Sequence, residues 1–165
     1  MIAKQRIGIV GAGMMGHGIA KNLVEKGFPL AVRGHRSRAP IDDLVGRGAT
    51  EVKTNADLAR ASDIVILCVT GAPQVEEVMF GPEGVASAAR PGTIVVDTST
   101  SEPATTAKMR EALAKQDVRF VDAPLARTPV EAEQGRLNTM VGADDATFEE
   151  LKPVFAAYCE NIVHA

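Results

Sequence analysis

The stretch QRIGIVGAGMMGHGIA, residues 5–20, decides the fold. Its apolar run at residues 7–10 is typical of a buried parallel strand, and the run stops at Gly11. Gly13 and Gly16 follow in the spacing G-x-G-x-x-G, and a helical pattern begins there. A strand, a glycine turn and a helix in this order predict a dinucleotide site. Gly11 would allow the tight turn, Gly13 would let a pyrophosphate approach the backbone, and Gly16 would let helix and strand pack closely.

The rest of the chain alternates between apolar strand patterns and helical patterns. Further strands are predicted at residues 28–32, 50–52, 63–69, 93–97, 119–123, 137–141 and 158–163. Helices are predicted at residues 14–26, 40–47, 55–61, 74–79, 85–89, about 102–115, 130–134 and 144–156. This alternation predicts an α/β fold with a doubly wound, mostly parallel sheet of the Rossmann type, in one domain over residues 1–165.

The composition excludes several classes of function. The chain has 165 residues, of which 45% are apolar and 24% charged, and its formal net charge is −3. That charge implies no general affinity for nucleic acid, so a phosphate site must be local. The longest apolar run, residues 64–69, is too short to span a membrane, and the first residues lack a signal-peptide pattern. Two distant cysteines and no metal-ligand spacing favour a cytoplasmic protein without a metal site.

The turn after the second predicted strand is strongly basic. It reads RGHRSR, residues 33–38, and no acidic residue follows before Asp42. In NAD-binding versions of this fold, an acidic residue near this position binds the ribose hydroxyls. A guanidinium group there would instead bind a 2′-phosphate, so we expect NADP(H) to be preferred over NAD(H). Arg36, with His35 and Ser37, is the main candidate; the alternative is a solvated basic loop.

Four stretches carry a resemblance to a known family. They are GAGMMGHGIAKNL at residues 11–23, DTSTSEP at 97–103, DAPL at 122–125 and GRLNTMVG at 135–142. In these motifs and their order the chain resembles the β-hydroxyacid dehydrogenases, the group that contains 3-hydroxyisobutyrate dehydrogenase and tartronate semialdehyde reductase and is related to 6-phosphogluconate dehydrogenase. The resemblance implies reversible oxidation of a small 3-hydroxy acid by NAD(P)+, with reduction as the direction in many members.

The resemblance also implies roles for particular residues. Met14 and Met15 would supply backbone contacts to the pyrophosphate, Val69 would lie along the cofactor, and Thr100 would lie near the nicotinamide. Helix capping is the alternative role for the hydroxyls around Thr100, and the two roles are compatible. His17 could help bind a phosphate or could lie on the helix surface. The predicted cofactor contacts are Gly11, Ala12, Gly13, Met14, Met15, Gly16, His35, Arg36, Ser37, Val69, Thr70 and Thr100.

The chain departs from the family pattern after residues 122–124. The family continues with Val-Ser-Gly-Gly, whereas this chain has Leu125-Ala126-Arg127-Thr128. A similar Gly-Arg-Thr variant occurs in the sulfolactaldehyde reductase branch, where the arginine contacts the anionic group of the substrate. We therefore expect Arg127 and Thr128 to bind a carboxylate, sulfonate or phosphate of a small anionic substrate. The alternative for Arg127 is an ordinary surface side chain.

The family's catalytic lysine is expected beyond Ala165, in a glycine-rich helix start, so no catalytic residue is assigned in this chain. The all-helical second domain, which carries most of the dimer contacts in the family, is expected beyond Ala165 as well. We expect a cofactor domain of a longer, homo-oligomeric enzyme that binds NADP(H) but shows little or no turnover by itself.

Two other functions remain open on the sequence. The chain could be a non-catalytic NADP(H)-binding module that senses the cofactor or serves as an interaction domain. It could also be the cofactor domain of an imine reductase, which shares the fold and most cofactor motifs. The residue that replaces the catalytic lysine would distinguish imine reduction from hydroxyacid chemistry.

Overall fold

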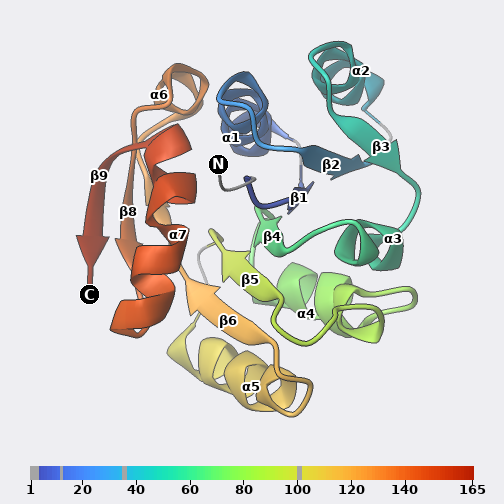
Figure 1. Ribbon diagram of the computed structural model, residues 1–165, viewed down its shortest axis with the longest axis vertical. Helices are drawn as coiled ribbons and strands as arrows, with labels where there is room; N and C mark the ends of the chain where they lie inside the picture. Colours follow the sequence, from blue (N-terminus) through green and yellow to red (C-terminus); the bar gives the residue numbers. More distant parts are fainter. Residues whose placement is uncertain (1–3, 12, 35–36, 100–101) are drawn as a thin grey trace.

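The computed structural model describes residues 4–11, 13–34, 37–99 and 102–165. Its main sheet has six parallel strands in the order β3-β2-β1-β4-β5-β6 (Figure 1). The strands are β1 (Ile7–Val10), β2 (Leu30–Arg33), β3 (Thr50–Val52), β4 (Ile64–Leu67), β5 (Ile94–Asp97) and β6 (Arg119–Asp122). The predicted doubly wound Rossmann-type fold is confirmed.

Helices cover both faces of this sheet and create two hydrophobic cores. One core lies under α1 (Met14–Glu25), α2 (Arg38–Gly46) and α7 (Asp145–Tyr158). The other lies under α3 (Asn55–Arg60), α4 (Ala72–Phe80), the 3₁₀ turn η1 (Val85–Ser87) and α5 (Pro103–Ala114). Because both faces are covered, every residue of β1, β4 and β5 is buried. This explains why those strands are continuous apolar runs.

The last two predicted strands belong to a second, smaller sheet. It consists of β7 (Leu125–Ala126), β8 (Leu137–Val141) and β9 (Cys159–His164), with β8 antiparallel to β7 and parallel to β9. The predicted doubly wound sheet therefore contains six of the strands, and the last two predicted strands lie outside it. In β8 buried residues alternate with partly or fully exposed ones, because only one face of this small sheet is covered. The strand β7 falls in a segment that was expected to be a loop.

Some predicted boundaries shift by a few residues. The predicted helix at residues 85–89 is a single 3₁₀ turn, Val85–Ser87. The second strand begins at Leu30 rather than at residue 28, although the Pro29 carbonyl still accepts a hydrogen bond from the Ile7 N–H at 2.8 Å. These shifts leave the order of the elements unchanged.

The short helix α6 (Pro129–Gln134) packs directly on α1. A Cβ on Gly18 would lie 2.5 Å from the carbonyl carbon of Ala132, so the two backbones touch where Gly18 has no side chain. One turn later, the Asn22 amide donates to the carbonyl oxygens of Ala132 at 3.0 Å and Glu133 at 3.2 Å. The amide thereby satisfies carbonyls at the end of α6 and holds that helix beside the glycine turn.

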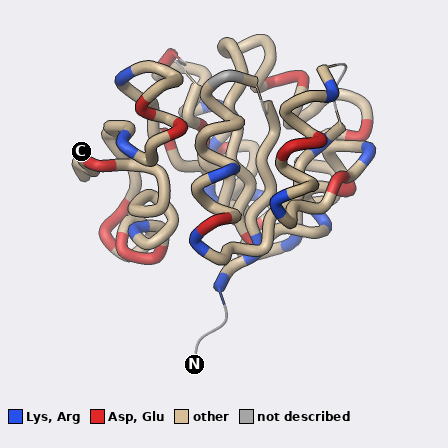
Figure 2. Tube along the Cα trace, turned by 90° about the horizontal axis from the view of Figure 1, so that it is seen from above, with Lys and Arg blue, Asp and Glu red and all other residues tan. Residues whose placement is uncertain are grey.

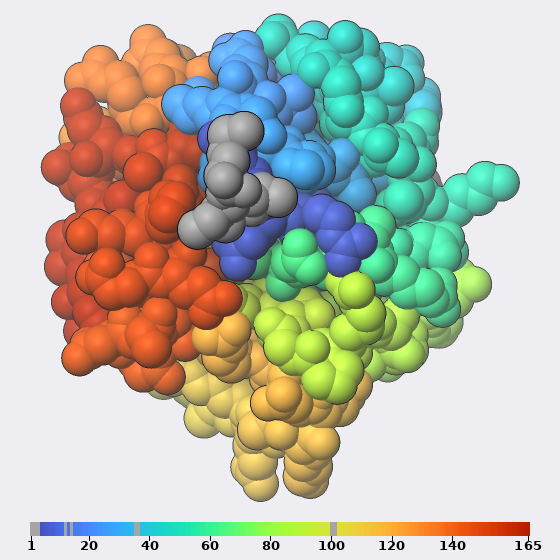
Figure 3. Space-filling view, in the orientation of Figure 1, coloured from blue at the N-terminus to red at the C-terminus, as the bar shows by residue number. Residues whose placement is uncertain are grey.

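Lys and Arg positions are interspersed with Asp and Glu positions along the trace (Figure 2). In the space-filling view, the C-terminal segments (red) lie on the side opposite α2 and β3 (teal) (Figure 3). Among the described residues, no helix is both long enough and apolar enough to cross a membrane.

Candidate functional site

The glycine turn lies at the point where the strand order reverses, between β1 and β4. Gly11 has a φ of +96°, and a Cβ there would lie 2.0 Å from the carbonyl oxygen of Cys68, just after β4. A Cβ on Gly16 would lie 1.8 Å from the Gly11 carbonyl oxygen. Side chains at these two positions are therefore incompatible with the observed packing of β1, β4 and α1.

The N-terminus of α1 is open to an anion. Gly13 is its N-cap, with no side-chain cap and no acidic residue in the first turn. Among the described residues, no atom lies within 4 Å of a Cβ placed on Gly13, and Gly13 is exposed. Unpaired N–H groups and the positive end of the helix dipole thus face free space at the switch point. This arrangement fits the pyrophosphate of a dinucleotide.

A cavity of about 320 Å³ extends from this turn along the carboxyl ends of the strands. Its walls include Gly11 after β1, Arg33 and Gly34 at the end of β2, and Val69 after β4. The start of α4, at Pro73 and Gln74, closes the other side. Open α/β sheets bind ligands at these strand ends, so the cavity is a candidate for the adenosine half of a dinucleotide.

The basic turn is only partly described. His35 and Arg36 lie outside the described residues, as do Ala12 and Thr100. Arg33 is exposed, and no ion pair of its side chain occurs among the described residues. Ser37 is the exposed N-cap of α2.

Arg38, the last residue of the basic turn, is engaged with acids. Its guanidinium donates to both carboxylate oxygens of Glu51 at 2.6 and 2.8 Å, and to Asp42 at 3.0 Å. The hydrogen bond and the charge of Glu51 raise the pKa of Arg38, and the same bond lowers the pKa of Glu51. Sequence reasoning missed Glu51, because it lies on β3 and reaches this turn only through the pairing of β3 with β2.

The residues after β4 and β5 are tied together. The Val69 N–H donates to the Ser99 hydroxyl at 3.1 Å, and the Thr98 hydroxyl donates to the Leu67 carbonyl at 2.7 Å. Ser99 N–H in turn donates to Asp97 at 2.9 Å. The loop after β4 is thereby fixed at the edge of the cavity.

Two more predicted cofactor contacts differ in exposure. Thr70 is exposed beside the start of α4. Met15 is half-buried and packs against the core, which leaves its backbone as the group available to a phosphate. For Met14 the structure describes only the backbone, at the start of α1.

Arg127, predicted to bind substrate, has protein partners. Its guanidinium forms an ion pair with Glu160 of β9 and donates to the Arg136 carbonyl at 2.8 Å. The hydrogen bond from Arg127 lowers the pKa of Glu160. Thr128 is the N-cap of α6, and its N–H donates to the Glu131 carboxylate at 3.2 Å. A substrate anion at Arg127 would therefore share the guanidinium with Glu160.

His17 lies between two carboxylates. Its Nδ1 is 2.5 Å from Glu133 on α6, and its Nε2 is 2.6 Å from Asp43 on α2. Partial burial alone would lower the pKa of His17, but hydrogen bonds to both acids outweigh it and raise the pKa. The imidazole thus links α1 to α2 and α6, and it is not free to bind a phosphate.

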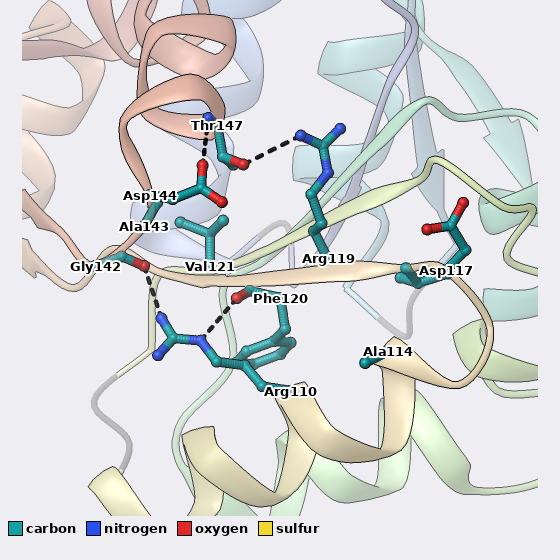
Figure 4. A pocket seen from close by; sticks show the side chains of 11 residues that line it. Arg110, Ala114, Asp117, Arg119, Phe120, Val121, Gly142, Ala143, Asp144 and Thr147 are labelled. Atoms are coloured by element: carbon teal, nitrogen blue, oxygen red, sulfur yellow. Dashed lines mark hydrogen bonds between the residues drawn. The ribbon is translucent and has the colours of Figure 1, made fainter.

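A larger cavity, of about 540 Å³, lies away from these residues, at the outer edge of β6 (Figure 4). There Arg110 of α5 donates to the Phe120 carbonyl at 3.1 Å and to the Gly142 carbonyl at 2.7 Å. Arg119 donates to the Thr147 hydroxyl at 3.1 Å and pairs with Glu150 of α7. Both guanidinium groups thus hold the open edge of the sheet, and we assign this cavity a structural role.

Near this edge, Asp122 is the last residue of β6 and lies beside Asp97, its register partner on β5. Partial burial, and then the charge of Asp97, raise the pKa of Asp122. Among the described residues, no group of three or more His, Cys, Asp or Glu side chains could hold a metal ion.

A parallel sheet in the order β3-β2-β1-β4-β5-β6, with a glycine turn and an open helix N-terminus at its switch point, defines a dinucleotide-binding domain. The family described as the NAD binding domain of 6-phosphogluconate dehydrogenase matches residues 6–165, and the chain belongs to this family.

Named relatives confirm the resemblance to the β-hydroxyacid dehydrogenases. The chain is 38% identical to 2-(hydroxymethyl)glutarate dehydrogenase of Eubacterium barkeri, over 96% of this chain and 52% of the relative. It is 36% identical to 2-hydroxy-3-oxopropionate reductase of Escherichia coli (strain K12), over 95% of this chain and 53% of the relative. The chain thus spans about half the length of the curated relatives it matches.

Solved structures of related enzymes have the same fold as this chain. A 3-hydroxyisobutyrate dehydrogenase from Salmonella typhimurium superposes with a TM-score of 0.90 at 30% identity, over 98% of this chain and 56% of that one. An imine reductase from Myxococcus stipitatus in complex with NADP+ has a TM-score of 0.85 at 21% identity, over 97% of this chain and 54% of that one, and shares the fold alone.

Substitutions at Gly13 and Gly11 should separate an effect on cofactor affinity from an effect on stability. We expect Gly13→Val to leave the free energy of unfolding nearly unchanged but to lower dinucleotide affinity about tenfold or more, because its side chain would occupy the space of the phosphates. Gly11→Ala is the matched control and should destabilise the fold by about 2 kcal/mol or more, because its Cβ meets the Cys68 carbonyl. Urea unfolding and nucleotide titration measure the two effects. Unchanged affinity in a folded Gly13→Val variant would contradict the site.

His17 predicts a pH-dependent stability. A histidine whose pKa is raised by folding stabilises the fold fully below its unfolded pKa, and this contribution is lost as pH rises through the folded pKa. Wild type should exceed His17→Gln in unfolding free energy by about 1 kcal/mol near pH 6, and the difference should shrink toward about pH 9. Urea unfolding at each pH measures it. In an Asp43→Asn, Glu133→Gln background this advantage at low pH should be lost or reversed, because burial alone lowers the pKa of His17; its persistence in the same direction would assign the effect elsewhere.

Proposed function

We propose that this chain is the cofactor domain of an NADP(H)-dependent oxidoreductase that interconverts a small anionic 3-hydroxy acid and its semialdehyde. The observation that carries the cofactor part is the open N-terminus of α1 at the switch point, where Gly13 faces free space. The chemistry is supported by relatives named as a dehydrogenase and a reductase of small hydroxy or oxo acids.

The residues of this chain bind and orient the cofactor. Backbone N–H groups of the first turn of α1 would hold the pyrophosphate, and Gly11 and Gly16 keep that turn against β4. Val69 and Thr70 would flank the cofactor, and Thr100 is proposed for its nicotinamide end. When bound, the reduced cofactor supplies a hydride to the substrate carbonyl carbon.

The preference for NADP(H) is proposed from the basic turn. Arg33 offers an exposed guanidinium at the wall of the cavity. Arg36, with His35 and Ser37, is proposed to bind the 2′-phosphate. A guanidinium can bind a phosphate bidentately, whereas it gains less from an uncharged ribose hydroxyl.

The substrate is proposed to be anionic because Arg127 and Thr128, which connect β7 to α6, offer a guanidinium and a hydroxyl group to an anion. The catalytic proton would come from the lysine that the family carries beyond the segment matching this chain. A helical second domain, a homo-oligomeric assembly and a cytoplasmic location are part of the same proposal. The second domain is supported by the length of the relatives, which are about twice as long as this chain. A cofactor-sensing module and an imine reductase remain the alternatives.

Cofactor preference can be measured by titrating the protein separately with NADPH and NADH. We expect NADPH to bind at least about tenfold more tightly, since each charge-assisted hydrogen bond contributes about 1.5–3 kcal/mol. Arg36→Ala should remove most of this preference while leaving NADH affinity unchanged. Equal affinities of wild type for the two nucleotides would contradict the proposal.

Turnover distinguishes the proposed chemistry from its alternatives. In the full-length protein, we expect steady NADPH oxidation with 2-hydroxy-3-oxopropionate or a related anionic semialdehyde, followed by NADPH absorbance. The 165-residue chain alone should bind NADPH without turnover, because the proposed proton donor lies outside it. Turnover of a cyclic imine alone would favour imine reduction, and binding without turnover of either substrate would favour the module. Steady turnover by the 165 residues alone would contradict the assignment of the proton donor.

A further inference from the structure

An acidic side chain from β3 lies at the end of β2. The strands pair in parallel with Val32 opposite Glu51, and the Gly34 N–H donates to the Val52 carbonyl at 3.0 Å. A Cβ on Gly34 would lie 2.3 Å from the Oε2 atom of Glu51. The carboxylate therefore rests against the backbone of Gly34, which is also a wall of the 320 Å³ cavity.

Arg38 covers this carboxylate. Its Nη1 and Nη2 donate to Oε2 and Oε1 of Glu51 at 2.6 and 2.8 Å, a bidentate arrangement that fixes both groups. Nη2 also donates to Asp42 one turn along α2, at 3.0 Å. The side chains are 49% exposed for Arg38 and 33% for Glu51, so the pair lies at the surface of the turn and not in the core.

The position of Glu51 gives the pair a consequence for ligand choice. In this fold, an acid near the end of the second strand binds the ribose hydroxyls of NAD and repels a 2′-phosphate. Here that turn has no acid of its own, but β3 supplies one to the same place. Arg38 neutralises it, and although Asp42 shares the Arg38 guanidinium, Arg33 and Arg36 of the same turn leave no net negative charge for a phosphate to meet.

We propose that Arg38 and Glu51 form a specificity-determining pair, in which Arg38 masks an acid that would otherwise select the non-phosphorylated cofactor. The inference rests on the proposed function for the class of ligand. Beyond that function, the inference says that Arg38 favours a 2′-phosphate mainly by neutralising Glu51. The effect of Arg38 on cofactor choice should therefore disappear when residue 51 is neutral.

A double-mutant cycle tests the pair. Wild type, Arg38→Ala, Glu51→Gln and the double variant are each titrated with NADPH and with NADH, and the ratio of the two dissociation constants is compared. Arg38→Ala should shift the ratio toward NADH by about tenfold, because it exposes a carboxylate beside the phosphate position. Glu51→Gln should shift it toward NADPH by about threefold, and the double variant should stay close to wild type.

The matched control is another exposed ion pair, Arg60 with Asp57, which joins residues of α3 at 2.8 Å; neither residue lines the 320 Å³ cavity. Arg60→Ala and Asp57→Asn should leave the ratio unchanged. Arg38→Lys should keep part of the preference, because an ammonium group still neutralises Glu51.

The proposal is wrong if Arg38→Ala shifts the ratio of the two dissociation constants equally in the wild-type and in the Glu51→Gln background. Arg38 would then act on the phosphate directly. If Arg38→Ala does not fold, as judged by loss of NADH binding and of the thermal transition, Glu51→Gln decides alone, and an unchanged ratio overturns the pair. A wild type that prefers NADH would contradict the proposed function, while the cycle would still decide the coupling.

Discussion

The rest of the structure depends on a close contact among three backbone segments at the glycine turn. The Gly11 backbone packs against the Cys68 carbonyl group, and the Gly16 backbone packs against the Gly11 carbonyl group. A Cβ atom on either glycine would clash with the carbonyl oxygen. This close approach brings α1 down onto the ends of β1 and β4, so its unpaired N–H groups point over the switch point. The proposed anion site is thus a consequence of packing, and the polar groups proposed for it belong to the backbone.

Ion pairs then hold the surrounding elements around that helix. His17 joins α1 to α2 and α6, and Arg47 pairs with both Asp43 and Glu25. Arg38 joins α2 to β3 in the same way. Each surface pair contributes little stability by itself, but the pair of Arg38 with Glu51 neutralises a charge that lies against Gly34, a wall of the cavity. The net charge of −3 therefore says little about the ligand, and the local pairing says much more.

The main sheet was predictable because its strands are covered on both faces. The run Ile64–Leu67 is apolar at every position and fully buried, and the predictions for such runs were right to within a few residues. The second sheet was not predicted, because the sequence of Leu137–Val141 does not alternate strictly between apolar and polar residues. Thr139 is buried and Met140 is 57% exposed, so the one covered face of this strand is evident only from the structure. The two-residue strand β7 has no sequence signal of its own, because only its pairing with β8 defines it.

The glycine turn could be predicted for a similar reason, since its requirements are local. The ion pairs could not, because each joins residues far apart in the sequence: Arg38 meets Glu51 through the pairing of β2 and β3, and Arg127 meets Glu160 through β9. Counting charges within a turn treats every guanidinium as available to a ligand. Here the carboxylate that decides the state of Arg38 is 13 residues away, and that of Arg127 is 33 residues away. In this chain, the guanidinium groups of the basic turn that are left without an acidic partner therefore depend on the register of β3 as well as on the turn itself.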